Sequence, residues 1–243
     1  MIAALSLANP RSHSVIAVAQ VTATPLPAPS TSPLVKPSPE QRKSPTPEYF
    51  VMIDPAHGGE DRGSVLPGKA QEKELTLSLA RELRKQLEER GVPTRLLRES
   101  DVNPSLEHRA EMANQNAAVI YVAIHAEALG RGIRIYSSSV PSAPPTGLER
   151  FLSWDDAQAS SLSRSRRLAN TVGVEMRKAD FQVSIRAAPL PPLHHLLMPA
   201  ISVEWSPEAD DLKPQQGSGA IARLTAALAS GIAVIYEASG ARP

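Results

Sequence analysis

The pattern of apolar and polar residues divides the chain near residue 49, and beyond that point strand-like and helix-like stretches follow one another. Residues 49–53 are a short apolar run, which predicts a buried strand, and residues 117–124 are an apolar run without alternation, which predicts a strand covered on both faces, as in a sheet between helices. Between them, leucines recur every four residues while Glu, Lys and Arg fill the other positions, which predicts an amphipathic helix over residues 72–90. These leucines are Leu75, Leu79, Leu83 and Leu87.

The same succession continues and predicts one layered α/β domain over residues 49–239. Gly91 suits the C-terminal cap of the first helix, and Ser105 suits the N-cap of the second. Residues 138–159 are rich in Ser and Pro and predict a loop, in which residues 148–154 are either a mobile flap or a segment pinned by aromatics. Further strands are expected at residues 92–97, 133–136 and 200–203, and further helices at residues 105–116, 160–178 and 219–236.

The first 48 residues do not predict a globular structure. Residues 25–48 are interpreted as a proline-rich disordered linker, because they have eight prolines and almost no large apolar side chains to bury. Residues 1–24 have two apolar stretches and a small-residue sequence at Ala17-Val18-Ala19, as at a signal cleavage site, but they lack the usual charged beginning. They are either a degenerate or truncated export signal or a disordered N-terminus without function.

Composition and charge narrow the classes of function. The formal net charge of +1 and the aromatic content of 4% argue against nucleic-acid binding, which needs basic patches and stacking side chains. The chain has no cysteine, so disulfides, iron–sulfur clusters and thiolate zinc sites are excluded. No run of 18 or more apolar residues is present, so no ordinary transmembrane helix is expected.

Three residues of types that commonly bind metals lie at the ends of predicted strands and helices. His57 follows the first strand within a glycine-rich loop, Glu72 begins the leucine-rich helix, and His125 follows the strand at residues 117–124. Functional groups of open α/β sheets collect at the carboxyl ends of strands, so these side chains are expected to meet. Two imidazoles and one carboxylate from separate elements match a catalytic zinc site whose fourth ligand is water.

Glu204 ends the predicted strand at residues 200–203, and a buried carboxylate there needs a partner or a raised pKa. Beside a zinc-activated water it would act as general base and then as general acid. Each candidate also has a plainer interpretation. These are a loop histidine for His57, a carboxylate stabilised by the helix dipole for Glu72, a strand-end histidine for His125, and half of a buried ion pair for Glu204.

Five short sequence motifs, four of which contain these residues, are more specific than the positions of single histidines and glutamates. They are residues 53–59 (Ile-Asp-Pro-Ala-His-Gly-Gly), 72–75 (Glu-Lys-Glu-Leu), Arg109 through Asn114, 123–126 (Ala-Ile-His-Ala) and 199–204. In this order they resemble the zinc-dependent N-acetylmuramoyl-L-alanine amidases of the bacterial cell wall, the amidase 3 family. The resemblance runs from residue 50 to residue 236 without a large gap.

The resemblance implies a single α/β domain with a mixed, mostly parallel sheet of about six strands. It also implies one Zn²⁺ ion held by His57, Glu72 and His125, with Glu204 as the catalytic glutamate. The implied reaction is hydrolysis of the peptidoglycan amide bond between N-acetylmuramic acid and L-alanine of the stem peptide. Such an enzyme would be exported to the periplasm or cell envelope, and whether it needs a protein activator stays open, as does its oligomeric state.

Two departures from the family pattern keep other functions open. Glu127 stands where the family usually has Asn, and Trp205-Ser206-Pro207 stands where Gly-Phe usually follows the catalytic glutamate. The alternatives are a catalytically silent peptidoglycan-binding or regulatory homologue and a zinc peptidase acting on stem peptides. The adjacent pair His194 and His195 is interpreted as structural residues or residues of the site's rim, because neighbouring strand residues face opposite ways. Arg109 is interpreted as a brace of the fold.

Overall fold

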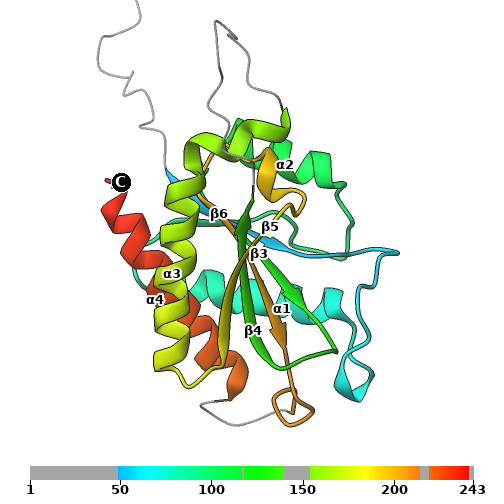
Figure 1. The fold of residues 1–243 in the computed structure, drawn as a ribbon. Coiled ribbons are helices and arrows are strands. Elements are labelled where there is room, and N and C mark those ends of the chain that lie inside the picture. Colours follow the sequence, from blue (N-terminus) through cyan, green and yellow to red (C-terminus); the bar gives the residue numbers. More distant parts are fainter. Residues whose placement is uncertain (1–48, 117, 140–153, 214–218, 241–243) are drawn as a thin grey trace, which may run out of the picture. The chain divides into compact units, whose positions relative to one another are not determined.

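The computed structural model describes residues 49–116, 118–139, 154–213 and 219–240, which contain a six-stranded sheet with helices on both faces (Figure 1). The export segment expected at residues 1–24, the linker expected at residues 25–48 and most of the loop expected at residues 138–159 lie outside the described residues.

The sheet has the strand order β2-β1-β3-β6-β4-β5. The first four strands of this order are mutually parallel, whereas β4 runs antiparallel to β6 and parallel to β5. The expected mixed, mostly parallel sheet is therefore confirmed. The strands are β1 Phe50–Pro55, β2 Thr94–Leu96, β3 Ala118–Ala126, β4 Gly132–Ser138, β5 Val183–Ala188 and β6 Ala200–Ser206.

Three long helices cover one face of the sheet, and α2 with the short turn η4 covers the other (Figure 1). Along β1, Val51 and Ile53 face the three-helix layer, while Phe50 and Met52 face α2. Burial on both faces explains why this strand has no apolar–polar alternation. The helices are α1 Glu72–Glu88, α2 Leu106–Gln115, α3 Leu162–Lys178 and α4 Ala220–Ala238, with the 3-10 turns η2 Pro67–Lys69, η3 Trp154–Ser161 and η4 Leu193–His195.

The apolar face of α1 packs as its spacing predicts, with all four leucines buried in the main core. Burying each leucine side chain contributes about 1.5–3 kcal/mol. Gly91 has a φ of 72° just after the helix, and the Ser105 hydroxyl accepts a hydrogen bond from the backbone N–H of His108. The N-cap Ser105 therefore lies where the sequence places it, whereas the C-cap of α1 is Glu89 and Gly91 follows two residues later in the left-handed conformation.

Among the described residues, α4 is the one helix that is long and apolar enough to cross a bilayer by length and composition. It has 19 residues with a mean hydropathy of 1.4, and 56% of the apolar stretch is buried inside the domain. Its buried side chains, among them Leu224, Leu228 and Ile232, belong to the main core. The alanine-rich composition of α4 thus serves packing against the sheet.

Some boundaries differ from those expected. Strands β3 and β6 continue to Ala126 and Ser206, so His125 and Glu204 lie within strands instead of directly after them. Pairing continues past the last apolar residue because backbone hydrogen bonds do not depend on side-chain polarity. The strand β5 has no counterpart in the predicted elements, since it is a half-exposed edge strand whose short, mixed sequence gives little periodic signal.

Candidate metal centre

The candidate metal ligands meet at the edge of the sheet where β1 and β3 end and α1 begins. His57 follows β1 by two residues, His125 is the penultimate residue of β3, and Glu72 is the first residue of α1. One nitrogen from each histidine and one Glu72 oxygen lie within 4.8 Å of one another. Among the described residues, the three side chains expected to bind a metal are thus brought together.

The geometry of the three donors fits one small divalent cation. His57 Nε2 lies 3.1 Å from Glu72 Oε2, and His125 Nδ1 lies 3.2 Å from Glu72 Oε1. Ligands about 2.0–2.1 Å from zinc at tetrahedral angles are separated by about 3.3 Å. The two imidazole rings are edge-to-face, with centroids 5.5 Å apart, so both rings can face a common point. The nitrogen and oxygen donors match zinc's preferences in a protein without thiols.

Glu72 is held as a carboxylate by hydrogen bonds from two other segments. The backbone N–H of Ser64 donates to Oε2 at 2.8 Å, and the backbone N–H of Ala126 donates to Oε1 at 3.0 Å. Burial raises the pKa of Glu72, but hydrogen bonds from His125, His57 and these N–H groups outweigh burial and bring the pKa far below its usual range. The site therefore presents an ionised carboxylate between two imidazoles.

Asp61 orients the first histidine, a role that the sequence did not reveal. Its carboxylate lies 2.8 Å from His57 Nδ1, which leaves Nε2 facing Glu72. A carboxylate on the far ring nitrogen fixes the imidazole tautomer and is common behind metal-bound histidines. The hydrogen bond that His57 donates to Glu72 raises the pKa of His57, burial opposes this, and Asp61 adds to the rise. The one hint in the sequence is the spacing of four residues within the glycine-rich loop.

The backbone of this loop approaches the donors closely. His57 itself has a φ of 62°, an uncommon conformation for a residue with a side chain. Gly63 has a φ of 64°, and a Cβ atom there would lie 2.5 Å from Glu72 Oε2 and 2.7 Å from His57 Cδ2. Only glycine therefore fits at position 63 without moving a candidate ligand.

Two buried arginines brace the segment that leads from β1 to His57. Arg109 on α2 forms an ion pair with Asp54 and also donates to the His57 carbonyl oxygen at 3.2 Å. Arg98 donates to the carbonyl oxygens of Pro55, Ala56 and Lys73 at 2.8–3.0 Å, which connects this segment to the first turn of α1. The expected bracing role of Arg109 agrees with these contacts. The Asp54 carboxylate accepts hydrogen bonds from Arg109 and from the Tyr121 hydroxyl, so it serves this brace.

Glu204 lines the same shallow cavity as the three candidate ligands, with a volume of about 340 Å³. It is paired in register with His125 on the neighbouring strand. The ion pair considered as the plainer interpretation is also present, because Arg134 on β4 donates to Glu204 Oε1, with Nε at 2.8 Å. Burial lowers the pKa of Arg134, but the Glu204 carboxylate outweighs burial and raises it.

The family departures have different structural consequences. Trp205 is 2% exposed and faces the main core, on the opposite side of β6 from Glu204. Glu127 lines the cavity, and its Oε1 accepts the backbone N–H groups of Ala128 and Leu129. The departure at position 205 thus stays inside the fold, whereas that at position 127 shapes the rim of the site.

The histidine pair belongs to a different part of the molecule. His194 and His195 lie on η4 with ring centroids 4.0 Å apart, and the His195 carbonyl accepts a hydrogen bond from Asn114. Neither residue lines the cavity of the candidate metal centre.

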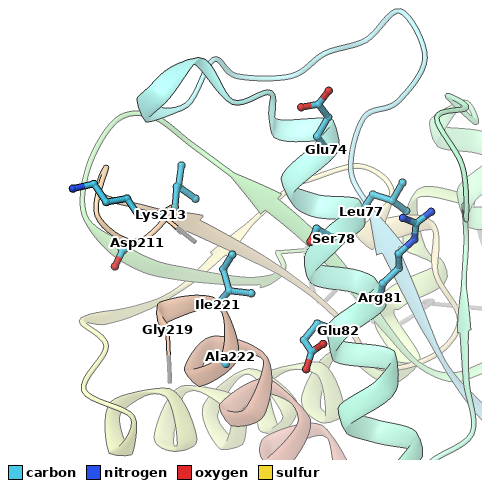
Figure 2. Close-up of a pocket in the computed structure, with 11 residues that line it drawn as sticks. Glu74, Leu77, Ser78, Arg81, Glu82, Asp211, Lys213, Gly219, Ile221 and Ala222 are labelled. Atoms are coloured by element: carbon cyan, nitrogen blue, oxygen red, sulfur yellow. The ribbon is translucent and has the colours of Figure 1, made fainter. Parts of the chain in front are cut away.

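A larger concavity of about 860 Å³ lies between α1, residues 211–213 and the beginning of α4 (Figure 2). In Figure 2, Ser78 and Glu82 of α1 lie on the side of this helix that faces Ile221 and Ala222 of α4. This larger concavity shares no lining residue with the cavity of the metal centre, and no histidine lines it. The chemistry of the donors, and not the size of the cavity, therefore locates the candidate site.

A family model and two curated relatives that this sequence matches are all described as N-acetylmuramoyl-L-alanine amidases. Residues 51–233 match the family model described as N-acetylmuramoyl-L-alanine amidase (Amidase_3). The amidase AmiC of Neisseria meningitidis serogroup B is 34% identical over 133 residues, which are 52% of this chain and 32% of that protein. The sporulation-specific amidase of Bacillus subtilis is 36% identical over 124 residues, which are 49% of this chain and 48% of that protein. The chain thus spans half or less of the length of these curated relatives.

Solved structures agree on the fold. The catalytic domain of CwlV from Bacillus (Paenibacillus) polymyxa has a TM-score of 0.59 at 22% identity, over 80% of this chain and 99% of that one. AmiC2 of Nostoc punctiforme has a TM-score of 0.58 at 24% identity, over 78% of this chain and 98% of that one. The match to the family model covers more than half of the sequence. The chain belongs to the Amidase_3 family of N-acetylmuramoyl-L-alanine amidases.

Proposed function

We propose that this chain is a zinc-dependent peptidoglycan amidase that hydrolyses the bond between N-acetylmuramic acid and L-alanine of the stem peptide. The observation that carries this proposal is the placement of His57, Glu72 and His125 around one point, with Glu204 in the same cavity. Family membership and the names of the relatives supply the substrate class.

The chain's own residues have distinct tasks in this mechanism. A zinc ion held by His57, Glu72 and His125 would lower the pKa of a water molecule to about 7 and polarise the amide carbonyl. Glu204 would take a proton from this water as it attacks the carbonyl carbon. After the C–N bond breaks, Glu204 would return the proton to the departing amine of L-alanine. Asp61 would keep the His57 ring in the tautomer that presents Nε2.

The proposed place of action is the cell envelope, because the substrate is a wall polymer and one relative is named a probable cell wall amidase of Staphylococcus aureus. A solved amidase from Clostridioides difficile is described in complex with the lipoprotein GerS. By analogy, we predict that a protein activator binds this chain. Measuring the amidase activity with and without an extract of the cell envelope would test this prediction.

The deciding experiment compares wild type with Glu204→Gln in zinc content and in the products of a peptidoglycan digest. We expect both proteins to bind one zinc ion, whereas only wild type releases intact stem peptides. The activity of the variant should fall by about 10²–10⁴-fold, because proton transfer is lost while the metal site stays. Zinc-free wild type would refute the metal site.

Mass spectrometry of the same digest separates the alternatives. Shortened stem peptides would identify a zinc peptidase acting on stems. Zinc binding without any product, including in the presence of envelope extract, would identify a catalytically silent homologue. Intact stems together with glycan strands that keep the lactyl group would identify the amidase.

A further inference from the structure

A row of three polar side chains crosses the sheet beside the metal centre. Arg134 on β4 is paired in register with Glu204 on β6, which is paired in register with His125 on β3. The apolar neighbours of Arg134 and Glu204 on their own strands point into the three-helix core. Because side chains alternate along a strand, the three residues of the row share the opposite face.

The two carboxylate oxygens of Glu204 have different surroundings. Arg134 donates from both Nε and Nη2 to the same oxygen, Oε1. In the part of the chain that the structure describes, no hydrogen bond reaches Oε2 of this carboxylate. One oxygen is therefore anchored, and the other is available in the cavity that the candidate ligands line.

Arg134 is itself anchored from two directions. Its Nη2 donates to the Ser206 hydroxyl at 2.9 Å and to the Leu129 carbonyl oxygen at 3.3 Å. The Ser206 hydroxyl also donates to the Leu129 carbonyl at 3.0 Å, which closes a small hydrogen-bonded ring. The loop after β3 lies close against the guanidinium, since a Cβ atom at Gly130 would be 2.6 Å from Nη1.

This ring connects residues near the two family departures. Glu127 accepts the backbone N–H groups of Ala128 and Leu129, and the carbonyl oxygen of the same Leu129 accepts from Arg134 and Ser206. Ser206 follows Trp205 and lies on the same strand face as Glu204, two residues away. Ser206, from the second departure, thus contacts the guanidinium directly, while Glu127, the first departure, binds the backbone of the loop that also contacts it.

We propose that Arg134 is a positioning residue that fixes the Glu204 carboxylate, so that Oε2 is the oxygen that receives and returns the proton. This inference rests on the proposed function for the identity of the reaction. A glutamate side chain has three rotatable bonds, and holding it in one orientation before reaction removes a cost from the catalytic step. Arg134 acts through Glu204 and does not itself contact the reacting atoms.

The test compares wild type, Arg134→Met and Arg134→Lys as purified, zinc-loaded full chains on peptidoglycan fragments. We expect kcat of Arg134→Met to fall by about 10–100-fold, as misplacement of a catalytic group by about 1 Å does, while KM and zinc affinity stay within about threefold. Arg134→Lys should recover part of the loss, because it keeps the charge but not the two-point contact. Arg131→Met is the matched control, since Arg131 is an exposed arginine three residues away, 4.0 Å from Glu208, and should leave kcat unchanged.

Three outcomes would overturn the proposal. An unchanged kcat in Arg134→Met would show that the pair is dispensable. A rise in KM alone would make Arg134 a substrate-binding residue, and a loss of zinc would make it part of the metal centre's structure.

Crystal structures of wild type and Arg134→Met supply a readout that does not need activity. We expect the Glu204 carboxylate to leave its wild-type position, or to occupy several, in the variant. A carboxylate that stays in place in Arg134→Met would refute the positioning role even in an active enzyme. If wild type cleaves nothing while the carboxylate still moves in the variant, the positioning role stands and the proposed function fails.

Discussion

On the β1–α1 side of the site, the Glu72 carboxylate receives backbone N–H groups from two segments and lies almost fully buried. On the β6–β4 side, Arg134 is the one side-chain partner of the Glu204 carboxylate among the residues that the structure describes, and the Glu204 and Arg134 side chains are 24% and 16% exposed. The first carboxylate is thus held in part by the folded backbone, and the second by a half-buried side chain. Substitutions on the two sides should therefore change different measured quantities.

We expect the β1–α1 side to govern zinc binding and the β6–β4 side to govern the rate of turnover. Backbone N–H groups are fixed once the loop at residues 58–71 folds, so the metal side should respond mainly to changes that disturb this loop. A side-chain ion pair can be removed without refolding the backbone, so the Glu204 side should respond in kcat at unchanged zinc affinity.

The largest effect on stability is expected from Arg109→Met on the metal side. This substitution leaves the buried Asp54 carboxylate without its cationic partner, which costs about 3–5 kcal/mol of unfolding free energy. Urea denaturation of zinc-free protein measures the loss. Arg84→Met is the control, because its ion pair with Glu99 is exposed and contributes about 0–1 kcal/mol. Equal losses in both variants would remove Arg109 as the brace of the His57 segment.

A smaller effect, specific to the metal, is expected from Gly63→Ala. The added Cβ would meet Glu72 Oε2 and the His57 ring, so zinc affinity should fall by about 10–100-fold, as it does when support around a ligand is disturbed. Competition with a chromophoric chelator measures the affinity. Gly68→Ala is a matched control, since Gly68 has a similar φ of 74° but nothing within 4 Å of the added atom. If Gly68→Ala weakens zinc binding as much, backbone strain and not the close approach is responsible.

The smallest effect concerns acid stability of the zinc-free protein. The folded-state pKa of Glu72 lies below its ordinary value of 4.5, so its ionised form contributes stability above that pH. This contribution is lost as the pH falls from 4.5 through the folded-state pKa. Glu72→Gln should therefore flatten the decline of unfolding free energy between about pH 5 and pH 3. Glu74→Gln, on the exposed side of the same helical turn, should keep the wild-type slope, and two equal slopes would contradict the assignment.

Local patterns were enough to predict most of the elements. The leucine spacing of α1, the unbroken apolar runs of β1 and β3, and the N-cap at Ser105 depend on neighbours in the chain, and the structure confirms each. The strand β5 was missed because an edge strand buries little apolar surface, so its sequence has no clear alternation of apolar and polar residues.

The gathering of His57, Glu72 and His125 was also predictable, because the ends of parallel strands share one edge of a sheet whatever their order. Their role as zinc ligands stays a prediction for the experiments above. The partner of His57 was not predictable in the same way, since Asp54 and Asp61 are both close in sequence. Only the path of the loop places Asp61 against the ring and turns Asp54 toward Arg109.

The sequence by itself thus determined most of the segments that become strands and helices, β5 excepted, and which polar residues stand near their ends, because both depend on local periodicity. The tertiary structure alone decided that β6 lies between β3 and β4, and so that Glu204 has His125 on one side and Arg134 on the other. Strand order and register come from contacts between segments about 70 residues apart, such as that of Arg134 with Glu204. No pattern within one segment records which neighbour it will find.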